Sequence, residues 1–188
     1  MGYICIQSLA CFIKKRNSNG GVYTMSTGLA ALTLIHVVIS LIGIVSGLVV
    51  TFGLLRSQRM DGWTALFLVT TVATSVTGFL FPFHKLLPSH ILGVISLVLL
   101  ALAIAGRYKF QLSGAWRRIY SVTAVLSLWL NVFVLIAQLF MKVPALHPLA
   151  PTGSEPPFLI SQTVVMIVFI ALAVLSAKNF RRDNTSAA

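Results

Sequence analysis

The chain has 188 residues, of which 57% are hydrophobic and only 9% charged, and its formal net charge is +11. A water-soluble domain carries roughly a quarter charged residues, so the composition and the mean hydropathy of +0.95 exclude a surface that faces water on all sides. The Lys and Arg residues lie in short segments between apolar runs, which is typical of membrane anchoring and not of nucleic-acid binding. We therefore expect an integral membrane protein with the lipid bilayer as its main partner and no nucleic acid.

Residues 1–24 form a tail whose apolar part is too short to cross a bilayer. The apolar stretch 3–13 is followed by positive charges at 14–16, whereas a signal peptide places its charges first. We predict a non-spanning tail followed by a transmembrane domain over residues 25–188. One hypothesis is that the working protein begins at Met25, and the alternative is a tail that lies on the membrane surface.

Five later segments are long and apolar enough to be membrane helices. A helix needs about 20 apolar residues to cross roughly 30 Å of hydrocarbon. The predicted fold class is therefore all-α, a bundle of five transmembrane helices. The five segments are residues 27–55, 63–81, 89–107, 119–141 and 158–177. The connection 142–157 contains five of the seven prolines, so we expect a loop without a helix of its own.

Lys and Arg are unevenly divided between the two ends of such a bundle. With the tail set aside, nine lie in the segments 56–62, 107–118 and 178–182, against two, Lys85 and Lys142, at the other end. Because positive charge stays in the cytoplasm, we predict the N-terminus outside and the C-terminus cytoplasmic. Four aromatic residues fall at the expected cytoplasmic interface, where such rings prefer to lie: Trp63, Tyr108, Trp116 and Tyr120.

In this orientation all histidines of the chain come to the outer end. They are His36, His84, His90 and His147. Imidazoles from several segments suit zinc, copper or haem iron, so one hypothesis is a haem or transition-metal site in this layer. The alternative is interfacial solvation, because histidine is tolerated at the membrane surface and no pair has the spacing H-x-x-x-H.

The first helix carries its small and polar residues on one face. His36, Ser40, Gly43 and Gly47 follow one another at intervals of four, three and four residues. The G-x-x-x-G pair Gly43 and Gly47 allows another helix to approach closely. We expect this face, including His36, to point to protein and not to lipid.

Helices two and four are polar for membrane helices. Helix two is rich in Thr, and helix four carries Ser127, Asn131 and Gln138 on one face. Amides inside a membrane need a partner, so both amide side chains should face the interior. Hydrogen bonding between helices explains this pattern, and a small-ligand pocket that opens outward is the alternative. That pocket would be lined by Thr74, Asn131, Gln138 and Glu155.

Three stretches resemble small multi-pass inner-membrane proteins of bacteria that are described only as uncharacterised. They are Ser75–His90 (SVTGFLFPFHKLLPSH), Asn131–Leu146 (NVFVLIAQLFMKVPAL) and Ser154–Phe158 (SEPPF). The resemblance begins near Met25 and covers nearly everything after it. It implies a bacterial inner membrane as the location and brings no activity, so no site residue comes from it.

Catalytic motifs are absent from the sequence. It contains no phosphate-binding glycine loop, nucleophile elbow, H-E-x-x-H motif or paired carboxylates, so it does not favour an enzyme. Three functions stay open: a non-catalytic accessory or assembly component packed against other membrane subunits, a haem- or metal-binding protein that uses the outer histidines, and a small-molecule carrier.

Overall fold

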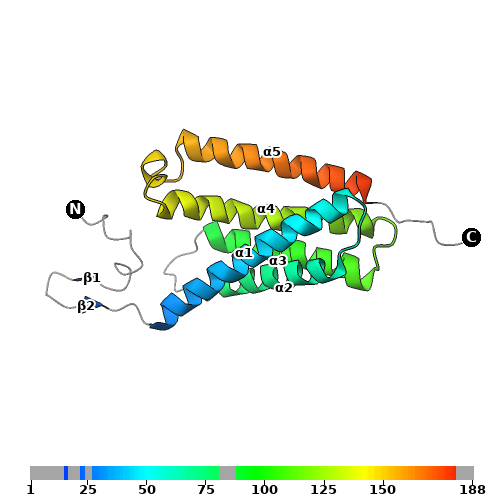
Figure 1. Cartoon of the computed structure of the whole chain (residues 1–188), viewed down its shortest axis with the longest axis horizontal. Coiled ribbons are helices and arrows are strands. Elements are labelled where there is room, and N and C mark those ends of the chain that lie inside the picture. The colour runs from blue at the N-terminus through cyan, green and yellow to red at the C-terminus, as the bar shows by residue number, and fades with distance from the viewer. Residues whose placement is uncertain (1–14, 17–21, 24–26, 81–87, 181–188) are drawn as a thin grey trace, which may run out of the picture.

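The computed structural model describes residues 15–16, 22–23, 27–80 and 88–180 of the chain. Its described part is a bundle of five long helices preceded by a short antiparallel β pair in which Lys15 lies opposite Tyr23 (Figure 1). The elements in chain order are β1 (Lys15–Arg16), β2 (Val22–Tyr23), α1 (Thr27–Leu55), α2 (Asp61–Gly78), α3 (Pro88–Ile104), the π-helical turn η1 (Ala105–Lys109), α4 (Trp116–Lys142), the 3-10 turn η2 (His147–Leu149) and α5 (Pro156–Asn179).

Consecutive helices run antiparallel and lie side by side along the long axis of the molecule (Figure 1). Helices α1 to α4 close a ring, because α1 packs on α2 and α4 while α3 packs on the same two helices. Helix α5 lies outside this ring against α4 and α1. Helix α4 therefore contacts every other helix, and its Val125 and Leu128 are completely buried.

The predicted elements are confirmed as helices, with shifts at their ends. The bounds of α1 are as predicted, whereas α4 begins three residues early, so Arg117 and Arg118 lie in its first turn and not in a loop. Helix α5 begins at Pro156, because proline suits the first turn, where its missing N–H would have no partner. The expectation of a loop without a helix was wrong for His147–Leu149, which form one 3-10 turn with Pro148 near its start.

Four of the five helices are long and apolar enough to cross a membrane. These candidate spans are Ala30–Leu55, Ile91–Lys109, Trp116–Lys142 and Pro156–Asn179. By length and composition the chain is therefore a multi-pass membrane protein. Helix α2 is the exception, because it begins with Asp61 and contains many hydroxyl residues that lower its hydropathy. The five helices are thus present, but composition alone identifies only four of them as spans.

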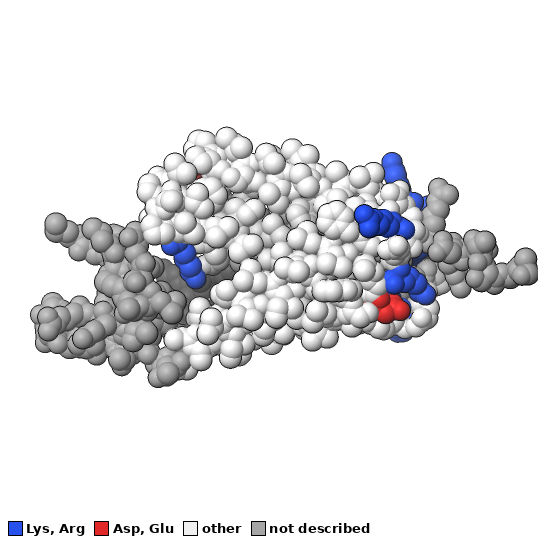
Figure 2. Space-filling view, in the orientation of Figure 1, with Lys and Arg blue, Asp and Glu red and all other residues white. Residues whose placement is uncertain are grey.

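The outside of the bundle is apolar along most of its length. Large side chains such as Ile35, Phe52, Ile91 and Ile167 are more than half exposed, which on a soluble protein would make an unusually large apolar surface. In Figure 2 the charged residues gather at one end of the molecule, and the surface between the ends is almost free of them. This division matches a protein whose middle lies in hydrocarbon.

Candidate functional site

Helix α2 divides its residues between a polar inner face and an apolar outer face. The buried positions include Thr64, Thr70, Thr71, Thr74 and Ser75. After the exposed first residues Asp61 and Gly62, the exposed residues of α2 are Trp63, Leu66, Val69 and Val76. The hydroxyl groups therefore point into the bundle, and the side that faces outward is apolar.

The inner face forms a seam of polar contacts that runs the length of α2. We call it the hydroxyl seam and define it by Thr64, Thr71, Thr74 and Thr77. From one end to the other, its contacts are Thr64 with the Tyr120 hydroxyl at 3.4 Å, Thr71 with the Asn131 amide at 3.4 Å, Thr74 with the Ser40 hydroxyl at 3.4 Å, and Thr77 with Nδ1 of His36 at 2.8 Å. The seam joins α2 to α4 at one end and to α1 at the other.

Most hydroxyl protons near the seam go to carbonyl groups of the same helix. Thr77 donates to the carbonyl oxygen of Ala73 at 2.7 Å, and Ser40 donates to that of His36 at 2.7 Å. This bond four residues back along a helix is a common way to satisfy a hydroxyl where water is absent. The hydroxyl oxygens then act toward neighbouring helices mainly as acceptors.

Two glycines of α1 allow this close packing, as the G-x-x-x-G pattern predicts. A Cβ atom at Gly47 would lie 2.7 Å from Cδ1 of Leu128 and 2.8 Å from the ring of Phe67, which is closer than real Cβ atoms approach. At Gly43 it would lie 3.2 Å from the hydroxyl of Thr70. The small-residue face of α1 is therefore occupied by α2 and α4 of the same chain.

His36 lies at the end of the hydroxyl seam and is half-buried, so it points to protein as predicted. Thr77 donates to the carbonyl oxygen of Ala73, so its own oxygen can accept from Nδ1 of His36, and the direction of this bond depends on the imidazole tautomer. In the neutral tautomer that is protonated on Nδ1, the lone pair is on Nε2. A metal ligand needs such a nitrogen, and a second bond that fixes the ring is usual for ligating histidines.

The other predicted histidines are placed only in part. His147 is exposed in η2, whereas His84 and the side chain of His90 lie outside the described residues. Among the residues that the structure describes, no three His, Cys, Asp or Glu side chains lie close enough to hold a metal ion. The proposed ligand set is therefore untested, and His36 is its one member with a defined setting.

The four residues of the predicted ligand pocket fall into different surroundings. Thr74 is buried, and Asn131 lies half-buried where α4 meets α2 and α1. Gln138 is exposed near the end of α4, so the expectation that it faces the interior was wrong. Its helical phase matches that of Asn131, but α1 diverges from α4 toward this end (Figure 1), and helical phase does not predict such a divergence.

Glu155 lies in the loop before α5 and uses its carboxylate within its own turn. It accepts hydrogen bonds from the backbone N–H and the hydroxyl of Thr152, at 3.0 and 2.9 Å, and from the N–H of Ser154 at 3.0 Å. Desolvation acts to raise the pKa of Glu155, but these hydrogen bonds outweigh it and hold the pKa below the usual value of 4.5. The residue orders this loop, and its carboxylate oxygens are already engaged.

The opposite end of the bundle contains a polar cluster that the sequence analysis did not identify. Arg107, in η1, is 93% buried and forms an ion pair with Asp61 at the start of α2. Its guanidinium lies 5.4 Å from the ring centre of Tyr120, whose hydroxyl contacts Thr64. Tyr120 is thus a core residue, not the interfacial one expected. The sequence feature that could have indicated this ion pair is Asp61, the one acid in the otherwise basic segment 56–62.

Comparison with models of known protein families, with curated proteins and with solved structures finds no match to this chain. The resemblance to bacterial inner-membrane proteins therefore identifies no family, and the function must be argued from the contacts above.

Proposed function

We propose that the chain is a non-catalytic accessory or assembly component of a bacterial inner-membrane complex. The observation that carries this proposal is the hydroxyl seam. Its polar side chains bind one another and the backbone of their own helices, so inside the bundle they serve packing and not chemistry. A membrane protein whose described interior serves packing is expected to act through what it binds.

We propose that α2 is the fifth span. It lies between α1 and α3 in the bundle (Figure 1), and its 18 residues reach about 27 Å, close to the thickness of the hydrocarbon layer. Its exposed face beyond Gly62 is apolar, and its hydroxyl groups face protein. A low hydropathy is compatible with a span when the polar groups are satisfied inside the bundle.

The orientation that we propose places the N-terminus outside and the C-terminus in the cytoplasm. The described Lys and Arg residues of the helix bundle lie at one end, with the exception of Lys142. They belong to the α1–α2 connection, η1, the first turn of α4 and the last turn of α5. Attachment of a reporter to each end, in cells, tests this. With five spans, a reporter at the start of α1 should lie outside and a reporter at the C-terminus in the cytoplasm. Reporters on the same side of the membrane, as four spans would give, contradict the arrangement.

Co-purification of the full chain in a mild detergent tests the accessory role. The proposal predicts that another membrane protein is recovered in a fixed ratio, and that Thr74→Val, which removes a seam hydroxyl at nearly constant volume, leaves this ratio unchanged. An untagged strain controls for carry-over. A chain that is recovered alone under every extraction condition contradicts the proposal.

A haem- or metal-binding protein is the second candidate, and the hydrogen bond between Nδ1 of His36 and Thr77 favours it. This bond orients the imidazole, as is usual for a ligating histidine, and in the tautomer protonated on Nδ1 the lone pair that a metal requires is on Nε2. His36→Ala should then remove bound metal or a haem absorption band from the protein purified from native membranes. Thr163→Ala is the control, because Thr163 is exposed on α5 and does not belong to the candidate ligand set. An unchanged metal content in His36→Ala excludes this candidate.

A further inference from the structure

One end of the bundle carries a concentration of positive charge that no other part of the described chain balances. We call it the basic end and define it by Arg56, Arg59, Arg107, Lys109, Arg117, Arg118 and Lys178. Asp61 is the one acid here among the described residues, and it is paired with Arg107. The remaining six cations have no carboxylate within 4 Å among the residues that the structure describes.

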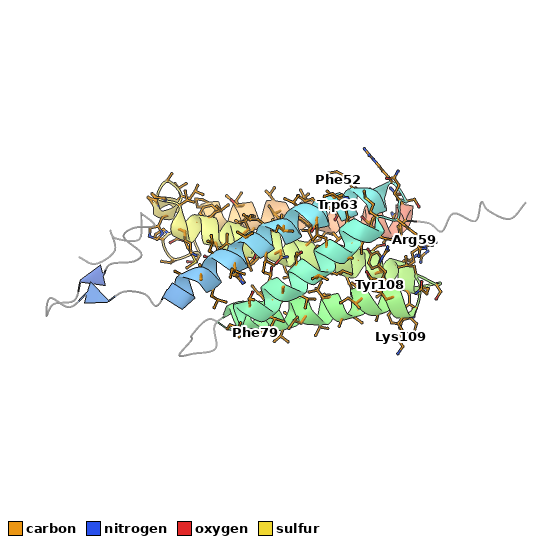
Figure 3. The ribbon with its side chains drawn as sticks, turned by 60° about the horizontal axis from the view of Figure 1, so that its bottom comes forward. Phe52, Arg59, Trp63, Phe79, Tyr108 and Lys109 are labelled. Carbon is orange, nitrogen blue, oxygen red and sulfur yellow. The ribbon has the colours of Figure 1, made fainter. Side chains whose placement is uncertain are left out.

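These cations come from several separate segments and surround the end of the bundle. Figure 3 shows Arg59 and Lys109 on different sides of this end, with Tyr108 between them. Arg118 lies in the first turn of α4 and Lys178 in the last turn of α5. A single small anion cannot contact groups so widely spread, whereas a layer of lipid headgroups can.

Exposed aromatic side chains accompany the cations at the basic end. Trp63 is 44% and Tyr108 50% exposed at the basic end (Figure 3), and such rings prefer the headgroup level. Phe110 and Trp116 stack at 3.8 Å with their planes 6° apart, which fixes the turn from which Lys109 and Arg118 extend. The cations of the basic end therefore extend from ordered turns and helix ends.

We propose that the basic end binds anionic phospholipid headgroups, of the phosphatidylglycerol type, in preference to zwitterionic ones. Each Lys or Arg close to an anionic membrane surface contributes on the order of a fivefold change in affinity. Six unbalanced cations at one depth make this end selective for the charge of the lipid. The inference needs the bundle to lie in a membrane, but it does not depend on the accessory role.

Lipid retention by the full chain in a neutral detergent tests the proposal, because orientation in a membrane then has no influence. Mixed micelles with phosphatidylglycerol or phosphatidylcholine are the probes, and bound lipid is counted by native mass spectrometry. The wild-type chain should retain phosphatidylglycerol preferentially, and the preference should weaken as salt rises from about 0.01 to 0.15 M, when the screening length falls from roughly 30 to 8 Å.

The exposed cations allow a matched set of variants. The triple variant Arg59→Gln, Lys109→Gln, Arg118→Gln should lose on the order of a hundredfold in affinity for phosphatidylglycerol, since each cation contributes roughly fivefold. The Lys142→Gln control, at the opposite end of α4, should keep the wild-type preference. If the triple variant does not fold, as judged by circular dichroism, the three single variants each predict a loss of about fivefold.

Three results would overturn the proposal. The first is equal retention of phosphatidylglycerol and phosphatidylcholine by the wild-type chain, and the second is an undiminished preference in the neutralised variants. The third is full displacement of the lipid by inorganic phosphate at the same phosphate concentration, which would indicate a site for a free anion. Recovery of a partner protein in the co-purification experiment is a separate outcome, so this inference and the accessory role can fail independently.

Discussion

The closest helix contact in the bundle provides a quantitative test of the packing. Gly47 of α1 leaves no room for a side chain, since an added Cβ would meet Leu128 and the Phe67 ring at 2.7 and 2.8 Å. Both neighbours are almost completely buried and cannot move away without disturbing other contacts. We expect Gly47→Ala to force α1 away from α2 and α4 at a cost of about 1–3 kcal/mol.

Alanine also stabilises a helix relative to glycine, by up to about 1 kcal/mol, so a control is needed. Gly53→Ala is the matched variant, because its Cβ would also lie 2.7 Å from a neighbour, but that neighbour is the flexible side chain of Met60. Both variants gain the helix propensity of alanine, but only Gly47→Ala places its new methyl group against the buried side chains of Leu128 and Phe67. The difference between their free energies of unfolding should therefore be on the order of 1–3 kcal/mol.

The assay is unfolding of the purified full chain in mixed micelles with increasing denaturing detergent, followed by circular dichroism. Gly47→Ala should unfold at a lower detergent fraction than wild type, whereas Gly53→Ala should unfold at the same fraction or a slightly higher one, because it gains helix propensity. Equal stability of the two variants would refute the close approach of α1 to α2 and α4. It would also remove the physical basis of the hydroxyl seam.

Three further predictions concern the polar contacts. Asp61→Asn should destabilise the chain in the same assay by about 1–3 kcal/mol, because it leaves the buried Arg107 without its carboxylate. The loss is smaller than for a fully buried ion pair, since Asp61 is 82% exposed. An unchanged stability would show that the pair is not formed. The lowered pKa of Glu155 means that its loop is stabilised above the ordinary pKa of 4.5 and loses this as pH falls through the lower folded value. The amide resonance of Thr152 should accordingly titrate with a midpoint below 4.5, and Glu155→Gln should abolish that titration; a midpoint above 4.5 contradicts the hydrogen bonds. Asn131→Leu should cost only about 0.6 kcal/mol, as is typical of an interhelical hydrogen bond in a membrane protein, and a loss of several kcal/mol would assign Asn131 more than packing.

Much of the fold follows from the amino-acid sequence, because length and apolarity determine membrane helices more strongly than they determine soluble ones. The bounds of α1 and the close approach at Gly43 and Gly47 were predicted correctly from apolar length and residue spacing. Helix α4 was predicted too short, since Arg117 and Arg118 read as loop residues although a first turn at the membrane surface accepts them.

What the sequence could not predict depends on contacts between distant segments. Arg107 and Asp61 are 46 positions apart, and only the packing of α2 beside α3 brings them together. Tyr120 was predicted to lie at the membrane interface because the spacing of residues in α4 does not reveal that this helix is the central one, where Tyr120 is buried. For the same reason, the hydrogen bond between Nδ1 of His36 and Thr77, which are 41 positions apart, follows only from the packing of α1 against α2.

Native mass spectrometry of the full chain, extracted from its own membranes in a mild detergent, tests the proposed function most directly. A component whose polar interior serves packing is predicted to appear in an assembly with at least one other membrane protein and without a stoichiometric metal or haem. A chain that appears alone, with one haem or metal ion bound and lost on His36→Ala, would contradict the accessory role and establish the outer end as a cofactor site.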